Sequence, residues 1–141
     1  WIGKIEEVVD NKTKNIYLIG HSIGCQAIMR YLEKTDIKVK GIVFVAGWFN
    51  LIEDCYNNNE EREIAKPWIE TPINFKEIKK KSKKILAIFS TNDDCVPLSD
   101  SELFKKRLNA NIIIKKNEGH FNGTSEIKEI IGFIENKTGG K

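Results

Sequence analysis

Short apolar runs alternate with amphipathic helical stripes along most of the chain. Four runs have the length and β-branched content of buried strands, and they cover residues 15–19, 41–47, 84–90 and 111–115. Apolar residues at helical spacing predict helices over about 1–11, 97–109 and 124–136, and a further helix that carries Cys25, Ile28, Met29 and Leu32 on one stripe. Strands that are apolar on both faces and alternate with helices are typical of a parallel sheet. We therefore expect an α/β fold of three layers, with a mostly parallel sheet covered by helices on both faces.

Residues 48–75 interrupt this alternation. The stretch is too long for an ordinary connection and shows no clean apolar period, although it contains Trp48 and Trp68. We predict an irregular excursion that lies near the functional edge of the sheet. The rest of the pattern predicts a single domain over residues 1–136, followed by a disordered tail over 137–141.

Two local signals concern the ends of helices. Ser99 and Glu102 have the spacing of a capping box at the start of the predicted helix 97–109. The densest basic run, residues 76–84, lies just before an apolar strand. It is therefore interpreted as a solvated helix end rather than an anion-binding patch.

Composition excludes several classes of protein. Of the 141 residues 40% are hydrophobic and 30% charged, and the net charge of +3 is too small to indicate nucleic acid binding. No stretch approaches the roughly 20 apolar residues of a membrane span. Cys25, Cys55 and Cys95 lack CxxC spacing, so neither a metal site nor a disulfide framework is expected. A reducing, cytoplasmic location fits this cysteine usage best.

The strongest local motif follows the first predicted strand. Residues 20–24 read Gly-His-Ser-Ile-Gly and are followed directly by a helical stripe. In G-x-S-x-G elbows the glycines permit a sharp turn and a close approach of helix to strand, which leaves the serine hydroxyl exposed. Ser22 is therefore a candidate nucleophile; the alternative is a serine that only caps the helix.

A serine nucleophile needs a base and an acid. The chain has two histidines, and His120 lies in a glycine-flanked loop after the last strand, where sites of parallel sheets gather. His21 adjoins Ser22, so we expect it to pack or hydrogen-bond beneath the turn. Asp93 and Asp94 follow the third strand, which places an acid between serine and histidine in chain order. All candidates follow strands and would meet at one edge of the sheet.

At these residues the chain resembles the α/β-hydrolases. More narrowly, it resembles the small serine hydrolases related to retinoblastoma-binding protein nine and its bacterial homologues. The resemblance rests on "WIGKI" leading to "GHSIGCQAIMRYL", then "FSTNDDCVP" and "NEGHFN", and it spans nearly the whole chain. It implies an esterase-like hydrolase without a cofactor, and some family members are linked to peptidase activity or to protein partners.

The resemblance also implies the roles of individual residues. Ser22 is the implied nucleophile and His120 the implied general base. The family pattern S-x-x-D-x-x-V-P selects Asp93 as the acid, with Asp94 as the alternative. Family members begin with a strand and a His-Gly loop that supplies one oxyanion donor, and neither precedes Trp1. The backbone N–H of Ile23 would supply the other donor. We therefore expect a fold that lacks the family's first strand, in a sequence that is part of a longer enzyme.

Two classes of function follow. The first is a serine hydrolase that cleaves small acyl esters or related acyl bonds through a Ser-His-Asp triad and an acyl-enzyme. The alternative is a non-catalytic, protein-binding module that retains the hydrolase fold. A thiol enzyme that uses Cys25 is a poor third interpretation, because this residue lies on an apolar helical stripe. Trp48 and Phe49 follow a strand at the functional edge and, with Trp68, are candidate walls of an acyl pocket. The alternative is that they simply cover the core.

Overall fold

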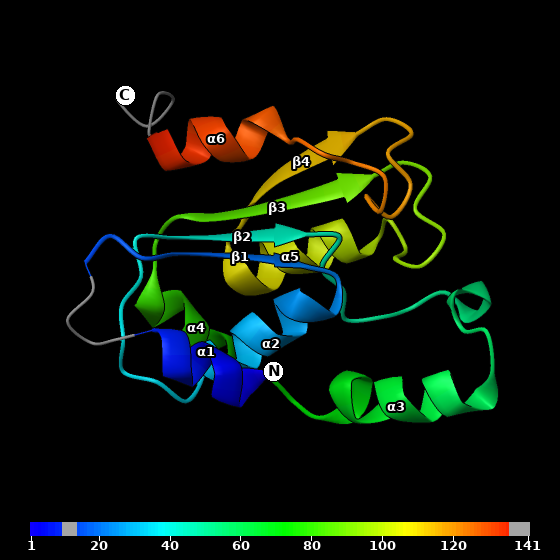
Figure 1. Ribbon diagram of the computed structural model, residues 1–141, viewed down its shortest axis with the longest axis horizontal. Coiled ribbons are helices and arrows are strands. Elements are labelled where there is room, and N and C mark those ends of the chain that lie inside the picture. The colour runs from blue at the N-terminus through cyan, green and yellow to red at the C-terminus, as the bar shows by residue number, and fades with distance from the viewer. Residues whose placement is uncertain (10–13, 136–141) are drawn as a thin grey trace.

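A four-stranded parallel sheet forms the centre of the protein. The computed structural model describes residues 1–9 and 14–135. The strands are β1 (Tyr17–His21), β2 (Gly41–Val45), β3 (Ile85–Ser90) and β4 (Asn111–Lys115), and they lie side by side in that order (Figure 1). Ile19 is paired with Val43, which is paired with Leu86 in turn. All three pairings are parallel, which confirms the predicted sheet.

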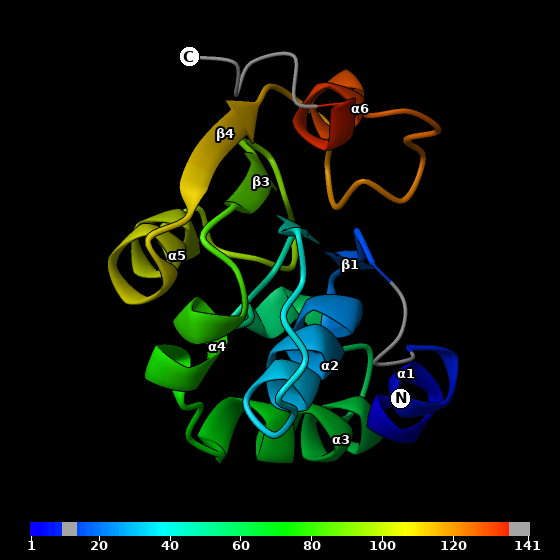
Figure 2. The same cartoon turned by 90° about the vertical axis from the view of Figure 1, so that its left-hand side faces the viewer.

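Helices cover both faces of this sheet, as the alternating pattern predicts. One face carries α2 (Ile23–Leu32), α4 (Phe75–Lys81) and α5 (Asp100–Leu108). The opposite face carries α6 (Lys128–Glu135) (Figure 2). Helix α1 (Ile2–Val8) packs beside α2. Every residue of β2 and β3 is buried, whereas the edge strands β1 and β4 are only partly buried. The buried central strands therefore place the carboxyl ends of all four parallel strands along one edge of the sheet.

The boundaries of the terminal helices differ from the predicted ones. The last helix begins at Lys128, four residues after the predicted start at 124. The end of the first predicted helix, residues 10–11, and the predicted tail over 137–141 lie outside the described residues. Within residues 1–9 and 14–135, no helix combines the length and the apolar content that crossing a membrane requires.

The segment 48–75 contains more regular structure than predicted. It forms a short 3₁₀ turn, η1 (Glu53–Cys55), and a helix, α3 (Asn59–Glu70). The side chain of Asn58 caps α3 by accepting a hydrogen bond from the backbone N–H of Glu61 at 2.9 Å. Ala65 is the one buried residue of α3, although Ile64, Ala65, Trp68 and Ile69 recur at helical spacing.

Side chains of α2 hold this segment against the body of the protein. Gln26 Nε2 donates a hydrogen bond to the carbonyl oxygen of Trp48 at 2.8 Å. The guanidinium group of Arg30 donates to three carbonyl oxygens at the end of α3, those of Trp68, Thr71 and Pro72. These residues are four apart on α2 and lie on one face of the helix. Helix α2 therefore positions both the candidate nucleophile and the segment that follows β2.

Of the two predictions about helix ends, the capping box at Ser99 is wrong and the solvated basic run is confirmed in part. Ser99 makes no side-chain capping bond at α5, so the predicted capping box is absent. The neighbouring Asp100 is fully buried instead and accepts hydrogen bonds from the backbone N–H groups of Phe49 and Asn50 at 2.7 and 2.9 Å. In the basic run, Lys79 and Lys80 are solvated as predicted, whereas Lys81 is buried.

Candidate active site

Ser22 lies in a strained turn between β1 and α2. Its φ of 53° and ψ of −118° are rarely adopted by residues other than glycine, and they turn the chain sharply from strand to helix. A Cβ on Gly20 would lie 2.8 Å from the backbone carbon of Gly24 and from Cδ1 of Ile28. Gly20 is thus required for the close approach of helix to strand. Gly24 is not, because a Cβ there would meet no atom within 4 Å.

The structure brings Ser22, His120 and Asp93 together in a chain of hydrogen bonds. His120 Nε2 lies 2.9 Å from Ser22 Oγ, and His120 Nδ1 lies 2.9 and 3.0 Å from the two carboxylate oxygens of Asp93. The side chains of His120 and Asp93 are 11% and 3% exposed. Asp94, the alternative acid, is exposed. The three residues that the sequence predicts therefore meet, although they are distant in the sequence.

The local environment keeps Asp93 ionised. Burial disfavours the carboxylate and raises its pKa, but hydrogen bonds from His120 and from the backbone N–H groups of Val96 and Cys95 outweigh this effect. The pKa of Asp93 is consequently below its ordinary value. An ionised Asp93 requires the proton of His120 to be on Nδ1, which leaves Nε2 free to accept the hydrogen bond from the Ser22 hydroxyl.

The loop that carries His120 has an unusual backbone. Gly119 has a φ of 58°, and the non-glycine residues Asn117 and Phe121 have φ values of 55° and 61°. These left-handed positions fold residues 116–121 back towards the end of β3. The flanking glycine in the sequence indicates one such position, but nothing in the residue pattern indicates Phe121.

Three polar residues at the end of β3 fasten this loop, and sequence reasoning missed them. The backbone N–H groups of residues 117, 118 and 119 donate hydrogen bonds to the side chains of Thr91, Ser90 and Asn92, at 3.1, 2.9 and 2.8 Å. The sequence did contain a signal for this role, because the polar residues 90–92 directly precede the candidate acid Asp93. Residues 90–92 hold the histidine loop, and Asp93 binds the histidine itself.

The sequence as a whole was compared with known protein families. Residues 1–130 match the model of the serine hydrolase family. The chain belongs to this serine hydrolase family.

Two relatives of this chain illustrate the similarity. The Bacillus subtilis protein YdeN is 25% identical over 123 residues, which cover 86% of this chain and 61% of YdeN. Serine hydrolase RBBP9 of Rattus norvegicus is 28% identical over 135 residues, which cover 96% of this chain and 67% of RBBP9. The chain thus spans about two thirds of the length of these relatives.

Solved structures show the same fold. The structure of B. subtilis YdeN superposes with a TM-score of 0.82 at 22% identity, covering 99% of this chain and 74% of YdeN. A carboxylesterase structure from Nitrososphaera gargenis has a TM-score of 0.67 at 12% identity, covering 98% of this chain and 70% of the other. The chain therefore has the predicted α/β-hydrolase architecture.

His21 contacts the histidine loop. Its Nε2 lies 2.7 Å from the carbonyl oxygen of His120, and the two imidazole rings are 5.0 Å apart between centroids. A carbonyl oxygen can only accept, so His21 donates this hydrogen bond. The predicted hydrogen-bonding role of His21 is confirmed, and its partner is the backbone of the second histidine.

The cysteines differ from the prediction. Cys55 of η1 and Cys95 of the Asp93 loop form a disulfide across a separation of 40 residues. Spacing did not indicate this pair, because the fold alone brings the two loops together. The disulfide also removes the cysteine argument for a reducing compartment, and a cytoplasmic location stays an expectation. Burial raises the pKa of the fully buried Cys25 thiol far above its ordinary value, which disfavours a thiol nucleophile there.

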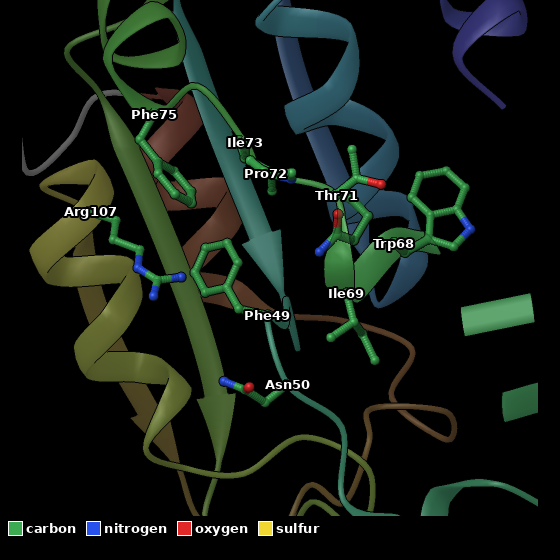
Figure 3. A pocket seen from close by; sticks show the side chains of 10 residues that line it. Phe49, Asn50, Trp68, Ile69, Thr71, Pro72, Ile73, Phe75 and Arg107 are labelled. Atoms are coloured by element: carbon green, nitrogen blue, oxygen red, sulfur yellow. The ribbon is translucent and has the colours of Figure 1, made fainter. Parts of the chain in front are cut away.

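The two aromatic residues proposed for a substrate pocket both belong to the hydrophobic core, where Trp48 is 2% and Phe49 8% exposed. Phe49 also lines a pocket beside α5 (Figure 3). Ser22, Asp93 and His120 do not line this pocket. Among the described residues no cluster of three or more His, Cys, Asp or Glu side chains could hold a metal ion.

Proposed function

We propose that this serine hydrolase cleaves small acyl esters through a covalent acyl-enzyme. Ser22 acts as the nucleophile, His120 as the general base and acid, and Asp93 as the residue that orients His120. The observation that carries the proposal is the hydrogen-bond chain from Asp93 through His120 to Ser22 Oγ, which ends at a strained strand–helix turn. The structural similarity to a carboxylesterase of Nitrososphaera gargenis supports an ester as the substrate class.

Each side chain has a defined task in the reaction. Ser22 Oγ attacks the carbonyl carbon of the ester while His120 Nε2 accepts the hydroxyl proton. The tetrahedral intermediate collapses as His120 returns this proton to the leaving alkoxide, and an alcohol departs. His120 then removes a proton from water, which attacks the acyl-enzyme and releases a carboxylic acid. Asp93 stabilises the imidazolium form of His120 in both steps.

The backbone N–H of Ile23 supplies an oxyanion donor in this mechanism. Ile23 is the first residue of α2, and the first N–H groups of a helix have no acceptor within the helix. The N-terminal end of a helix also carries a partial positive charge, which favours the developing oxyanion. This donor adjoins Ser22, as in G-x-S-x-G elbows generally.

Activity-based labelling tests the proposal directly. The folded chain is expected to react with a fluorophosphonate probe and to release p-nitrophenol from p-nitrophenyl acetate with an initial burst. Ser22→Ala should abolish labelling and reduce turnover by a factor on the order of 10⁶. Ser99→Ala is the matched control, because Ser99 is exposed and its side chain forms no capping bond.

Two results would contradict the proposal. One is labelling of the Ser22→Ala variant as strong as that of the unchanged chain. The other is a folded, unchanged chain that neither labels nor hydrolyses any ester of an acyl series from acetate to octanoate. The second result would favour the alternative of a non-catalytic, protein-binding module.

A further inference from the structure

A pocket of about 400 Å³ lies apart from the hydrogen-bonded group at Ser22 (Figure 3). It is formed between α5 on one side and the end of the 48–75 segment on the other, with Phe49 at the end of β2 between them. Ser22, Asp93 and His120 are not among its lining residues. Its volume is within the range of roughly 300–1,000 Å³ that is usual for small-molecule sites.

Arg107 is the single charged residue that lines this pocket, and no carboxylate lines it. The guanidinium carbon lies 5.0 Å from the ring centroid of Phe49 and 5.4 Å from that of Phe75. These contacts hold the long side chain in place without using its N–H donors. Arg107 forms no hydrogen bond or ion pair with the residues that the structure describes. The pocket therefore presents one positive charge whose donors have no partner among residues 1–9 and 14–135.

The pocket also has an apolar part, although the polar residues Gln26, Asn50 and Thr71 line it too. Trp68, Ile69 and Ile73 lie across the pocket from Phe49 (Figure 3). Ile69 is 37% exposed, so an isoleucine side chain of α3 faces the opening rather than the core. A ligand with an apolar body would cover this surface and remove it from water.

The position of the pocket walls is set by buried contacts. Asp100 fixes the backbone at Phe49 and Asn50 through hydrogen bonds of 2.7 and 2.9 Å. Arg30 fixes the opposite wall through the carbonyl oxygens of Thr71 and Pro72 at 2.6 and 2.7 Å. Both anchors are buried, so the pocket is formed before a ligand arrives.

We propose that this pocket is a binding site for organic carboxylates. The carboxylate pairs with the N–H groups of Arg107 in a two-pronged geometry. The apolar body of the ligand lies between Phe49 and the wall of Ile69 and Ile73. This site is separate from the proposed hydrolytic centre and does not depend on its activity.

Isothermal titration with 4-phenylbutyrate tests the site, with 4-phenyl-1-butanol as the uncharged counterpart. The carboxylate should bind about tenfold more tightly than the alcohol, as expected for a hydrogen-bonded charge pair. Arg107→Gln should remove this preference. Lys106→Gln is the matched control, because Lys106 is also exposed, adjoins Arg107 on α5 and does not line the pocket.

A second pair of variants places a negative charge on α3. Ile69→Glu should abolish binding of 4-phenylbutyrate, because the new carboxylate faces the same pocket. Ile64→Glu should leave binding unchanged, since Ile64 is 59% exposed and does not line the pocket. Circular dichroism of each variant verifies that the fold is retained.

Ser22→Ala separates this site from the hydrolytic centre. Binding of 4-phenylbutyrate should be the same in Ser22→Ala as in the unchanged chain, whether or not the chain hydrolyses esters. The proposal is overturned if the acid and the alcohol bind equally, if neither binds, or if Arg107→Gln binds the acid as well as Lys106→Gln does. Loss of binding in a folded Ser22→Ala variant would also overturn it, because the carboxylate would then occupy the hydrolytic centre.

Discussion

The His21 side chain donates a hydrogen bond to the backbone carbonyl oxygen of His120 at 2.7 Å. The residue next to the proposed nucleophile thus holds the loop that carries the proposed base. Because His21 directly precedes Ser22, a movement of the strand–helix turn would shift both the proposed nucleophile and the loop that carries the proposed base.

Replacement of His21 tests this relationship. His21→Ala should lower the kcat/KM for p-nitrophenyl acetate about three- to tenfold, which corresponds to the loss of one ordinary hydrogen bond. His21→Gln should recover most of this loss, because its amide nitrogen can replace Nε2 as the donor. Equal rates for the alanine variant and the unchanged chain would show that His21 does not position His120.

Asp93 and Asp94 form a matched pair for testing the proposed acid. Asp93→Asn should reduce kcat by a factor on the order of 10⁴, because an amide holds the imidazole in the wrong tautomer. Asp94→Asn should stay within about twofold of the unchanged chain, since Asp94 is exposed and adjoins Asp93 in the same loop. Steady-state kinetics on both variants measures the difference, and the reverse order of effects would assign the acid to Asp94.

The lowered pKa of Asp93 also predicts a dependence of stability on pH. A carboxyl group whose folded-state pKa lies below its unfolded value of about 3.9 stabilises the fold above that value. This contribution is lost as the pH falls from about 4 through the folded-state pKa. Urea unfolding between pH 2 and 6 should therefore show a weaker loss of stability in acid for Asp93→Asn. If the stability of the variant and of the unchanged chain depended on pH in the same way, the lowered pKa of Asp93 would be contradicted.

Gly20 and Gly24 should respond in opposite ways to alanine. Gly20→Ala places a Cβ 2.8 Å from the backbone of α2, so the free energy of unfolding should fall by about 1–3 kcal/mol. Gly24→Ala meets no atom within 4 Å and should raise the helix stability by up to about 1 kcal/mol. Urea denaturation measures both changes. A Gly20→Ala variant as stable as the unchanged chain would show that the strand and helix can separate.

The Cys55–Cys95 disulfide should contribute about 2–4 kcal/mol to the free energy of unfolding, because it closes a loop of 40 residues. Dithiothreitol should lower the stability of the unchanged chain by this amount. The double variant Cys55→Ser and Cys95→Ser should be equally destabilised and insensitive to the reductant. Detection of three free thiols in the unfolded, unreduced chain would show that the disulfide does not form.

Much of the fold could be predicted because it depends on strong local patterns. β2 and β3 are apolar at nearly every position, and only a strand buried on both faces satisfies such a run. The motif around Ser22 and the order of Asp93 and His120 placed three residues at one edge of the sheet before any contact was known. Helix α3 was missed because its apolar stripe is short and Pro67, a residue that usually interrupts helices, lies inside it.

The amino-acid sequence by itself determined the parallel sheet, its helices and the residues that gather at its carboxyl edge, because each depends on periodicity or on a short motif. Only the tertiary structure decided which distant groups meet. The disulfide, the fastening of the histidine loop by residues 90–92 and the single charge of Arg107 in its pocket are of this kind. Each depends on residues that are distant in the sequence, and packing of the whole chain sets the distance between them.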